Sequence, residues 1–269
     1  MISTEHIASL FLYTLPVSFR DHTRQFFKQY ASSFRKRNDP VYNQHIELKK
    51  YHTERVCREI SGLGSALGMN TGQVAFAEVI GWLHDIGRFE QFDRFGTFSD
   101  AESENHADAA LRVVRNEGLL KDFEPEMFEA VTRSILNHNQ PKVPENEPDH
   151  IDFYSRLLRD TDKLDIWRIT IEMNIFHKLN TEIFPETYIV PSLLMNCFEE
   201  YRIITLDMVN SFYDSIVFRV SWIFDLNFSC TLKTISERNI IARLLKKLPV
   251  SDNLYKIKYL TDHYIQINT

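Results

Sequence analysis

The stretch of sequence that decides the fold runs from Thr71 to Gly87 and reads TGQVAFAEVIGWLHDIG. Apolar side chains cover nearly every side of a helix here, and they are Val74, Phe76, Val79, Ile80, Trp82 and Leu83. A helix that is apolar all round is typical of one buried in a protein interior. Gly87 ends the pattern, which places His84 and Asp85 in the last turn of the predicted helix.

The adjacent pair His84-Asp85 is the most informative feature of this stretch. An ionised carboxylate at the end of a buried helix is costly unless positive charge or hydrogen-bond donors pair with it. An exposed helix end beside Gly87 would explain the same pair without special chemistry. Companion residues elsewhere in the chain therefore decide between the two interpretations.

The rest of the chain also predicts helices. Only 8 glycines occur among 269 residues, and few apolar runs alternate strictly, so the sequence indicates an all-α fold. Helices are expected over residues 1–37, 41–60, 71–87, 103–117, 125–141 and 150–173, with further helices over 179–269. Breaks are expected at the residues Asp39-Pro40, Gly62, Gly64, Gly68, Pro185, Pro191 and Pro249.

The loops between the predicted helices indicate a single domain. No linker is rich enough in Gly, Ser or Pro to separate two domains. We therefore expect one compact multi-helix bundle over residues 1–269, with a core of about 41–170, an additional N-terminal helix and a helical C-terminal extension of about 171–269.

Three histidines lie on apolar stripes of three different predicted helices. His52 follows the spacing of Leu48, Val56 and Ile60, which recur every four residues. His106 shares a side with Ala110 and Val113, and His138 follows Phe128, Val131 and Ile135. One such histidine is usually a satisfied core residue. Three of them together with His84 and Asp85 favour a metal site, because neutral imidazole is a common ligand and helical bundles bind metals through inward-facing side chains.

Two later carboxylates, Asp160 and Asp162, are further candidate ligands. Each lies on an apolar stripe of the helix predicted over residues 150–173. Residues two apart point about 200° from each other on a helix, so both cannot serve one metal. Spacing alone does not choose between them.

Three motifs in this order resemble the HD-domain superfamily, whose pattern is a His on one helix, a His-Asp pair ending another and a later Asp. The matching segments are His52-Thr53-Glu54-Arg55-Val56, Leu83-His84-Asp85-Ile86-Gly87-Arg88 and Thr161-Asp162-Lys163-Leu164-Asp165. The resemblance covers about residues 41–168 and implies an all-helical HD-type bundle. It favours Asp162 over Asp160, with Thr161 where the family commonly has Ala.

The resemblance also implies a metal content. Members with two extra histidines between the His-Asp pair and the last Asp bind two metals, and His106 and His138 stand in those places. One divalent ion is then expected on His52, His84, Asp85 and Asp162, and a second on His106 and His138, with Asp85 bridging the two ions. A donor set without thiolate suits Mn, Fe, Co, Ni or Mg.

The composition limits the partners. Acidic residues number 37 against 31 basic ones, and no terminal basic run is present, so long nucleic acid is not expected as a partner. Three scattered cysteines indicate reduced thiols and a cytoplasmic location, and the N-terminus lacks the pattern of a secretion signal. Charged residues interrupt the most apolar stretch, Phe212–Phe228, which favours a buried helix over a membrane span.

The resemblance to the HD-domain superfamily implies a metal-dependent phosphohydrolase acting on a phosphoester or phosphoanhydride of a nucleotide or similar small molecule. Asp85 is expected to be catalytic through the metals, while Arg88 and Lys163 are expected to bind the substrate phosphate. The alternatives are a di-iron oxygenase resembling myo-inositol oxygenase, and a non-catalytic regulatory protein that binds metal or nucleotide. The run Phe212–Phe228 is expected to close the pocket or to form a homo-oligomer interface.

Overall fold

The computed structural model describes Leu10 and residues 12–172 and 186–269. This part of the chain contains α-helices and short 3-10 helices and no extended strand, so the predicted all-α fold is confirmed. The chain divides into an N-terminal unit, Thr4–Asp162, and a C-terminal unit that includes Lys163–Thr269. The division falls inside helix α8, Asp149–Glu172.

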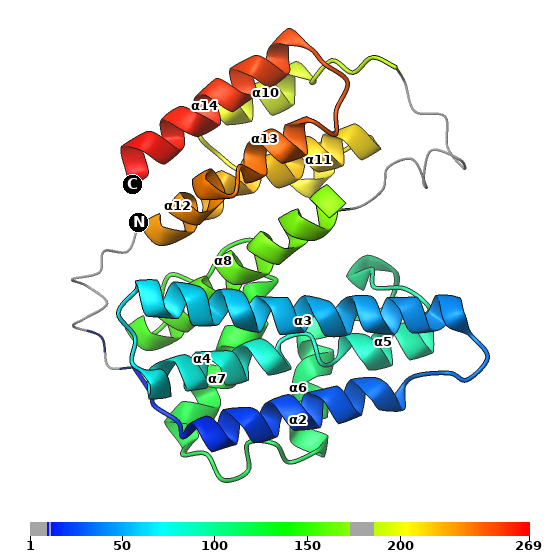
Figure 1. The fold of residues 1–269 in the computed structure, drawn as a ribbon, viewed down its shortest axis with the longest axis vertical. Coiled ribbons are helices and arrows are strands. Elements are labelled where there is room, and N and C mark those ends of the chain that lie inside the picture. The colour runs from blue at the N-terminus through cyan, green and yellow to red at the C-terminus, as the bar shows by residue number, and fades with distance from the viewer. Residues whose placement is uncertain (1–9, 11, 173–185) are drawn as a thin grey trace. The chain divides into compact units, whose positions relative to one another are not determined.

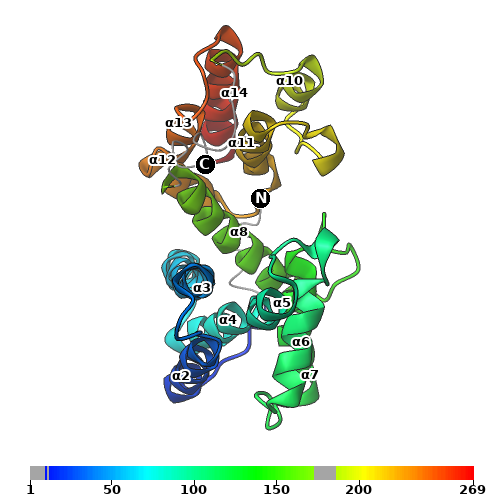
Figure 2. The ribbon, with the colours of Figure 1, turned by 90° about the vertical axis from the view of Figure 1, so that its right-hand side faces the viewer.

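The N-terminal unit is built around helix α4, Thr71–Leu83, in which every residue from Val74 onward is buried. α4 packs against α2 and α3 on either side of it and also contacts α7 (Figure 1, Figure 2). The helices of this unit, in chain order, are α2 (Val17–Ser33), α3 (Pro40–Ala66), α4, α5 (Arg88–Phe95), η1 (Asp100–Glu102), α6 (His106–Asn116), α7 (Pro125–His138) and the first part of α8.

Local sequence sets both ends of α4. Asn70 accepts a hydrogen bond from the Gln73 backbone N–H, and the Gln73 side chain accepts one from the Asn70 N–H, which forms a capping box. The helix ends at Leu83, one residue before the predicted last turn, and His84 follows as the C-terminal cap. His84 and Asp85 therefore lie in the tight turn that joins α4 to α5.

Gly87, in the same turn, permits a close approach to α6. A Cβ atom at Gly87 would lie 2.3 Å from the Ala110 nitrogen and 2.7 Å from the Ala109 Cβ. These are distances that real Cβ atoms do not adopt, so glycine is required here. The close approach brings α6, whose first residue is His106, beside the His84-Asp85 turn.

The helix predicted over residues 41–60 needs correction. α3 does not end near Ile60 but continues through Gly62 and Gly64, and the chain turns only at Gly68, where φ is 79°. Gly64 lies within close packing distance of Met69 and Val74, so it is a packing glycine and not a break. Leu48, predicted to be on the buried stripe of α3, is 45% exposed.

α6 begins at His106 and not near Ser103, because the Asn105 side chain accepts hydrogen bonds from the backbone N–H groups of Ala107 and Asp108 and caps the helix there. Of the helix predicted over residues 1–37, the described residues form only α2, and residues 12–16 and 34–37 lie outside it. Residues 1–9 and 11 of that prediction lie outside the described residues, as do 173–185, which include Pro185.

The C-terminal unit contains the rest of α8 and several shorter helices. They are α10 (Ser192–Glu199), η2 (Leu206–Met208), α11 (Phe212–Ser221), η3 (Trp222–Asp225), α12 (Ser229–Glu237), α13 (Ile240–Leu245) and α14 (Asp252–Asn268). The single buried helix predicted over Phe212–Phe228 is wrong, because the α-helix ends at Ser221 and a 3-10 turn follows. Pro191 and Pro249 lie outside helices, as predicted. Among the described helices none has the length and apolar character needed to cross a membrane.

We expect Gly87→Ala to lower the free energy of unfolding by about 1–3 kcal/mol, because the new methyl group would push α6 away from the turn. Gly62→Ala is the matched control. Gly62 is exposed near the C-terminal end of α3 with nothing within 4 Å of a Cβ atom, so this change should raise stability by about 0.5–1 kcal/mol. Denaturant unfolding of both variants measures the difference. A Gly87→Ala protein as stable as the wild type would contradict the close approach.

Candidate metal centre

His84 presents one bare ring nitrogen to the interior of the N-terminal unit. The side chain is fully buried, and its Nδ1 lies 2.7 Å from the Gly81 carbonyl oxygen. A carbonyl can only accept, so Nδ1 carries the proton and Nε2 carries a lone pair. This Nε2 is buried and makes no hydrogen bond with the described residues. Such an unpartnered acceptor is expected where a metal ion binds.

Asp85 lies at the centre of a group of imidazoles. Its Oδ2 is 3.5 Å from His52 Nε2 and 3.9 Å from His84 Nε2, while its Oδ1 is 3.7 Å from His106 Nε2. The carboxylate is 3% exposed. It therefore faces histidines from α3, from the turn after α4 and from α6.

Asp162 joins this group from α8. Its Oδ1 lies 3.1 Å from His52 Nε2, as the resemblance implied when it favoured Asp162. Asp160, the alternative on spacing, is fully buried on the same helix. The structure thus brings His52, His84, Asp85 and Asp162 together.

His106 and His138 form the second half of the cluster. Their Nε2 atoms are 2.9 Å apart. The Nδ1 of His106 donates to Asp100 Oδ2 at 2.6 Å, and the Nδ1 of His138 donates to the Ile135 carbonyl. With both Nδ1 atoms protonated, both Nε2 atoms carry lone pairs, which repel at this distance unless a cation or a proton lies between them. Histidines held in this way are typical of metal ligands.

Two ligand groups therefore share Asp85. His52, His84 and Asp85 form one, and Asp85, His106 and His138 form the other. In each group the candidate ligand atoms all lie within 4.8 Å of one another, and all five residues are buried. With Asp162 added, all six residues predicted as ligands are in one place, and their four imidazoles and two carboxylates are a donor set that could hold divalent metal ions.

The electrostatics favour the protonation states that metal binding needs. Burial lowers the pKa of His84, and it lowers the pKa of His138 to about 3, so both rings are neutral at pH 7. Burial alone would raise the pKa of Asp85, but the charges of Lys49 and Arg88 outweigh it and hold this pKa well below the usual range. Neutral imidazoles and an ionised carboxylate are ready to bind a cation.

Neighbouring residues hold the ligands in place. Arg159 of α8 donates to the carbonyls of Asn137 and His138 and so fixes the end of α7. Asn139 donates to the Asn105 side chain at 3.0 Å, which ties the end of α7 to the start of α6. The two helix ends that carry His138 and His106 are therefore linked directly.

The two predicted phosphate-binding cations lie in different environments. Arg88 reaches the cluster, with Nε 3.3 Å from Asp85 Oδ1 and Nη1 2.7 Å from Asp100 Oδ1. The Nζ of Lys163 lies 2.6 Å from Asp225 Oδ2 and 3.1 Å from the Asp225 carbonyl, and its phosphate-binding role stays a prediction. Its ammonium is engaged with a carboxylate of the C-terminal unit.

Three residues at the cluster were not predicted. Lys49 lies 2.9 Å from Asp85 Oδ2, Asp100 binds both His106 and Arg88, and Gln91 donates to Asp100 at 3.0 Å. Lys49 stands three residues before His52 on the same helix face, a spacing that could have identified it. No periodic pattern marks Asp100, because it lies in the short η1 segment.

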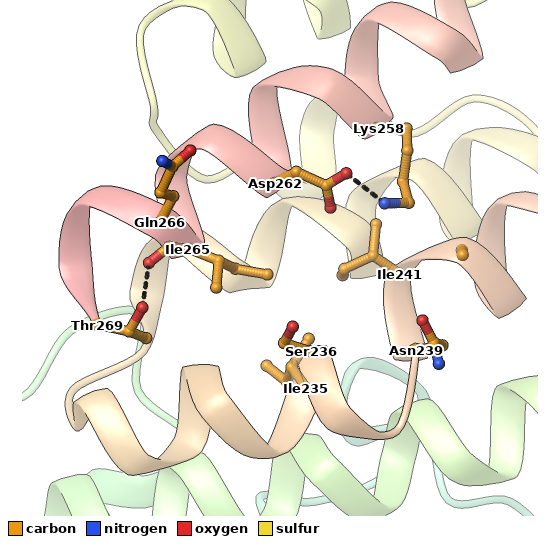
Figure 3. Close-up of a pocket in the computed structure, with 10 residues that line it drawn as sticks. Ile235, Ser236, Asn239, Ile241, Lys258, Asp262, Ile265, Gln266 and Thr269 are labelled. Atoms are coloured by element: carbon orange, nitrogen blue, oxygen red, sulfur yellow. Dashed lines mark hydrogen bonds and ion pairs between the residues drawn. The ribbon is translucent and has the colours of Figure 1, made fainter.

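A groove of about 480 Å³ in the C-terminal unit contains none of these residues (Figure 3). It lies between α12, α13 and α14. The Lys258 and Asp262 side chains on its wall form an ion pair with each other. Its remaining lining is uncharged and includes Ile235, Asn239 and Gln266. This groove offers no group of metal ligands, whereas the cluster around Asp85 does.

The fold and this cluster define an all-helical protein with a candidate two-metal centre. The family model described as HD domain matches residues 50–167, and this match confirms the predicted resemblance over that part of the chain. HD domains belong largely to metal-dependent hydrolases. No curated protein and no solved structure matches the chain.

We expect the protein, purified without a chelator, to retain two divalent ions per chain, one for each ligand group. His138→Ala should reduce the content to about one ion, because the second group loses a nitrogen ligand while His52, His84 and Asp85 remain. Mass spectrometry of the metals in the purified protein measures this content.

His22→Ala is the control, since His22 is exposed on α2 and is not in either group. It should leave the metal content unchanged. Equal metal content in the wild type and the His138→Ala variant would contradict the second ligand group.

Proposed function

We propose that this protein is a phosphohydrolase that cleaves a phosphoester or phosphoanhydride bond of a nucleotide or similar small molecule at a two-metal centre. The observation that carries the proposal is the pair of ligand groups that share Asp85. Two divalent ions bound there would lower the pKa of a shared water towards neutrality and stabilise charge on phosphoryl oxygens.

The charge of the cluster supports an anionic substrate. Four of the six candidate ligands are imidazoles, which add no charge, so only Asp85 and Asp162 offset the charge of the ions. The positive charge of two divalent ions exceeds the negative charge of these two carboxylates. The loaded centre would be cationic and buried, where an attached phosphoryl group is attracted strongly.

Arg88 is the side chain that we assign to the phosphoryl group. Its Nε donates to Asp85, and its Nη1 donates to Asp100, Gln91 and the Phe98 carbonyl, so the guanidinium is held in one orientation. Its Nη2 makes no hydrogen bond within the described part of the chain, which leaves one donor of the fork for an anion. Lys163 is not part of the proposal, because it binds Asp225.

Asp85→Ala should lower phosphate release by more than about 100-fold, because changes to groups that only support a ligand already cost 10- to 100-fold. The assay supplies Mn²⁺ or Co²⁺ and a panel of nucleotides and small phosphoesters, and it measures free phosphate. Asp152→Ala is the control. Asp152 pairs with Arg156 on α8 and should keep full activity.

Phosphate release that survives Asp85→Ala would overturn the proposal. Two other results point to different functions. A mixed-valent di-iron signal by electron paramagnetic resonance, with no phosphate release, would indicate an oxygenase. Tight metal retention without turnover on any substrate of the panel would indicate a regulatory protein.

A further inference from the structure

Lys49 places an ammonium group directly on the shared carboxylate. Its Nζ lies 2.9 Å from Asp85 Oδ2, and the side chain is 16% exposed. Lys49 is on α3, almost one turn before His52, and it precedes the segment 50–167 that matches the HD domain.

The oxygen that Lys49 binds is also a candidate metal ligand. Asp85 Oδ2 lies 3.5 Å from His52 Nε2 and 3.9 Å from His84 Nε2, and these three residues form the first ligand group. An ammonium and a divalent ion at the same oxygen repel each other, and burial strengthens that repulsion. Lys49 and the metal therefore compete for Asp85 Oδ2.

Lys49 and Arg88 flank Asp85 on its two oxygens. Lys49 approaches Oδ2, and Arg88 Nε approaches Oδ1 at 3.3 Å. Both also contact Phe98: the Lys49 Nζ lies 5.3 Å from the centre of its ring, and Arg88 Nη1 donates to its carbonyl at 2.7 Å. The two cations thus lie on the same side of the cluster, near one residue, where a single phosphoryl group could contact both.

We propose that Lys49 is a phosphate-binding residue that pairs with Asp85 in the metal-free protein and with a phosphoryl oxygen of the substrate in the metal-bound protein. The inference relies on the proposed function for the identity of this anion. It adds an order of binding: the anion binds well only after the metal has displaced Lys49 from Asp85. By reciprocity, phosphate should in turn tighten metal binding.

The test compares Lys49→Met with Lys50→Met. Lys50 is the neighbouring lysine on α3, with a side chain 19% exposed, and its Nζ pairs with Glu47 Oε2 at 3.2 Å. Metal-stripped proteins are titrated with Mn²⁺ by calorimetry, and the Mn²⁺-loaded proteins are then titrated with inorganic phosphate. Lys49→Arg keeps the positive charge and serves as the conservative variant.

Lys49→Met should bind Mn²⁺ more tightly than the wild type, by about 5- to 150-fold, because the competing cation is gone. The Mn²⁺-loaded variant should bind phosphate more weakly by a factor in the same range. Lys50→Met should match the wild type in both titrations, and Lys49→Arg should restore most of the phosphate affinity.

Unchanged or weaker Mn²⁺ binding by Lys49→Met would overturn the competition, and unchanged phosphate binding would overturn the phosphate-binding role. Lys49→Gln replaces Lys49→Met if the latter does not fold, as judged by its thermal unfolding. Neither titration depends on turnover. A protein that hydrolyses nothing can still confirm the role of Lys49, and a failed role for Lys49 leaves the Asp85→Ala test of hydrolysis intact.

Discussion

The buried carboxylate of Asp85 is the constraint on which the site depends. A negative charge that is 3% exposed needs positive charge around it, and the histidines beside it are kept neutral where burial lowers their pKa. In the described structure Lys49 and Arg88 supply that positive charge. The imidazole lone pairs that face Asp85 gain nothing from these two cations. A metal ion satisfies both requirements at once, since it neutralises the carboxylate and accepts the lone pairs.

The fold is arranged to bring these groups to one point. The candidate ligands come from α3, from the turn after α4, and from α6, α7 and α8, so no short segment could supply them. Gly87 permits α6 to approach the turn, and Arg159 fixes the end of α7. Hydrogen bonds on Nδ1 of His84, His106 and His138 then select the tautomer that leaves Nε2 unprotonated. Packing sets the positions, and hydrogen bonds set the orientation and protonation.

Much of this arrangement could be predicted from the sequence, because apolar periodicity reports which side of a helix faces inward. That signal marked His52 and His138 on stripes whose neighbours Val56 and Ile135 are fully buried. It failed where packing is specific to the tertiary structure. Gly64 was predicted to interrupt a helix, but it lies inside α3 and packs against Met69 and Val74. The helix expected over Phe212–Phe228 ends at Ser221.

The side chains that complete the site were harder to predict. Asp100 lies in a 3-10 turn without periodicity, and only the folded chain shows that it binds His106 and Arg88. Lys163 follows the candidate ligand Asp162 in the sequence, but a lysine side chain is long and flexible, so sequence position does not fix its partner. In the structure it pairs with Asp225. Motif resemblance selected Asp162, whereas helical geometry alone excluded only the joint use of Asp160 and Asp162.

We propose that Asp85 bridges two metal ions. A crystal structure of the protein purified without chelator, with anomalous diffraction recorded at the absorption edge of the metal found, tests it directly. Two anomalous peaks are expected, with His84 Nε2 about 2.0–2.3 Å from one and His106 Nε2 at a similar distance from the other. Each Asp85 oxygen should approach one of the peaks. A cluster with no anomalous peak, or with a single peak to which Asp85 is not bound, would contradict it.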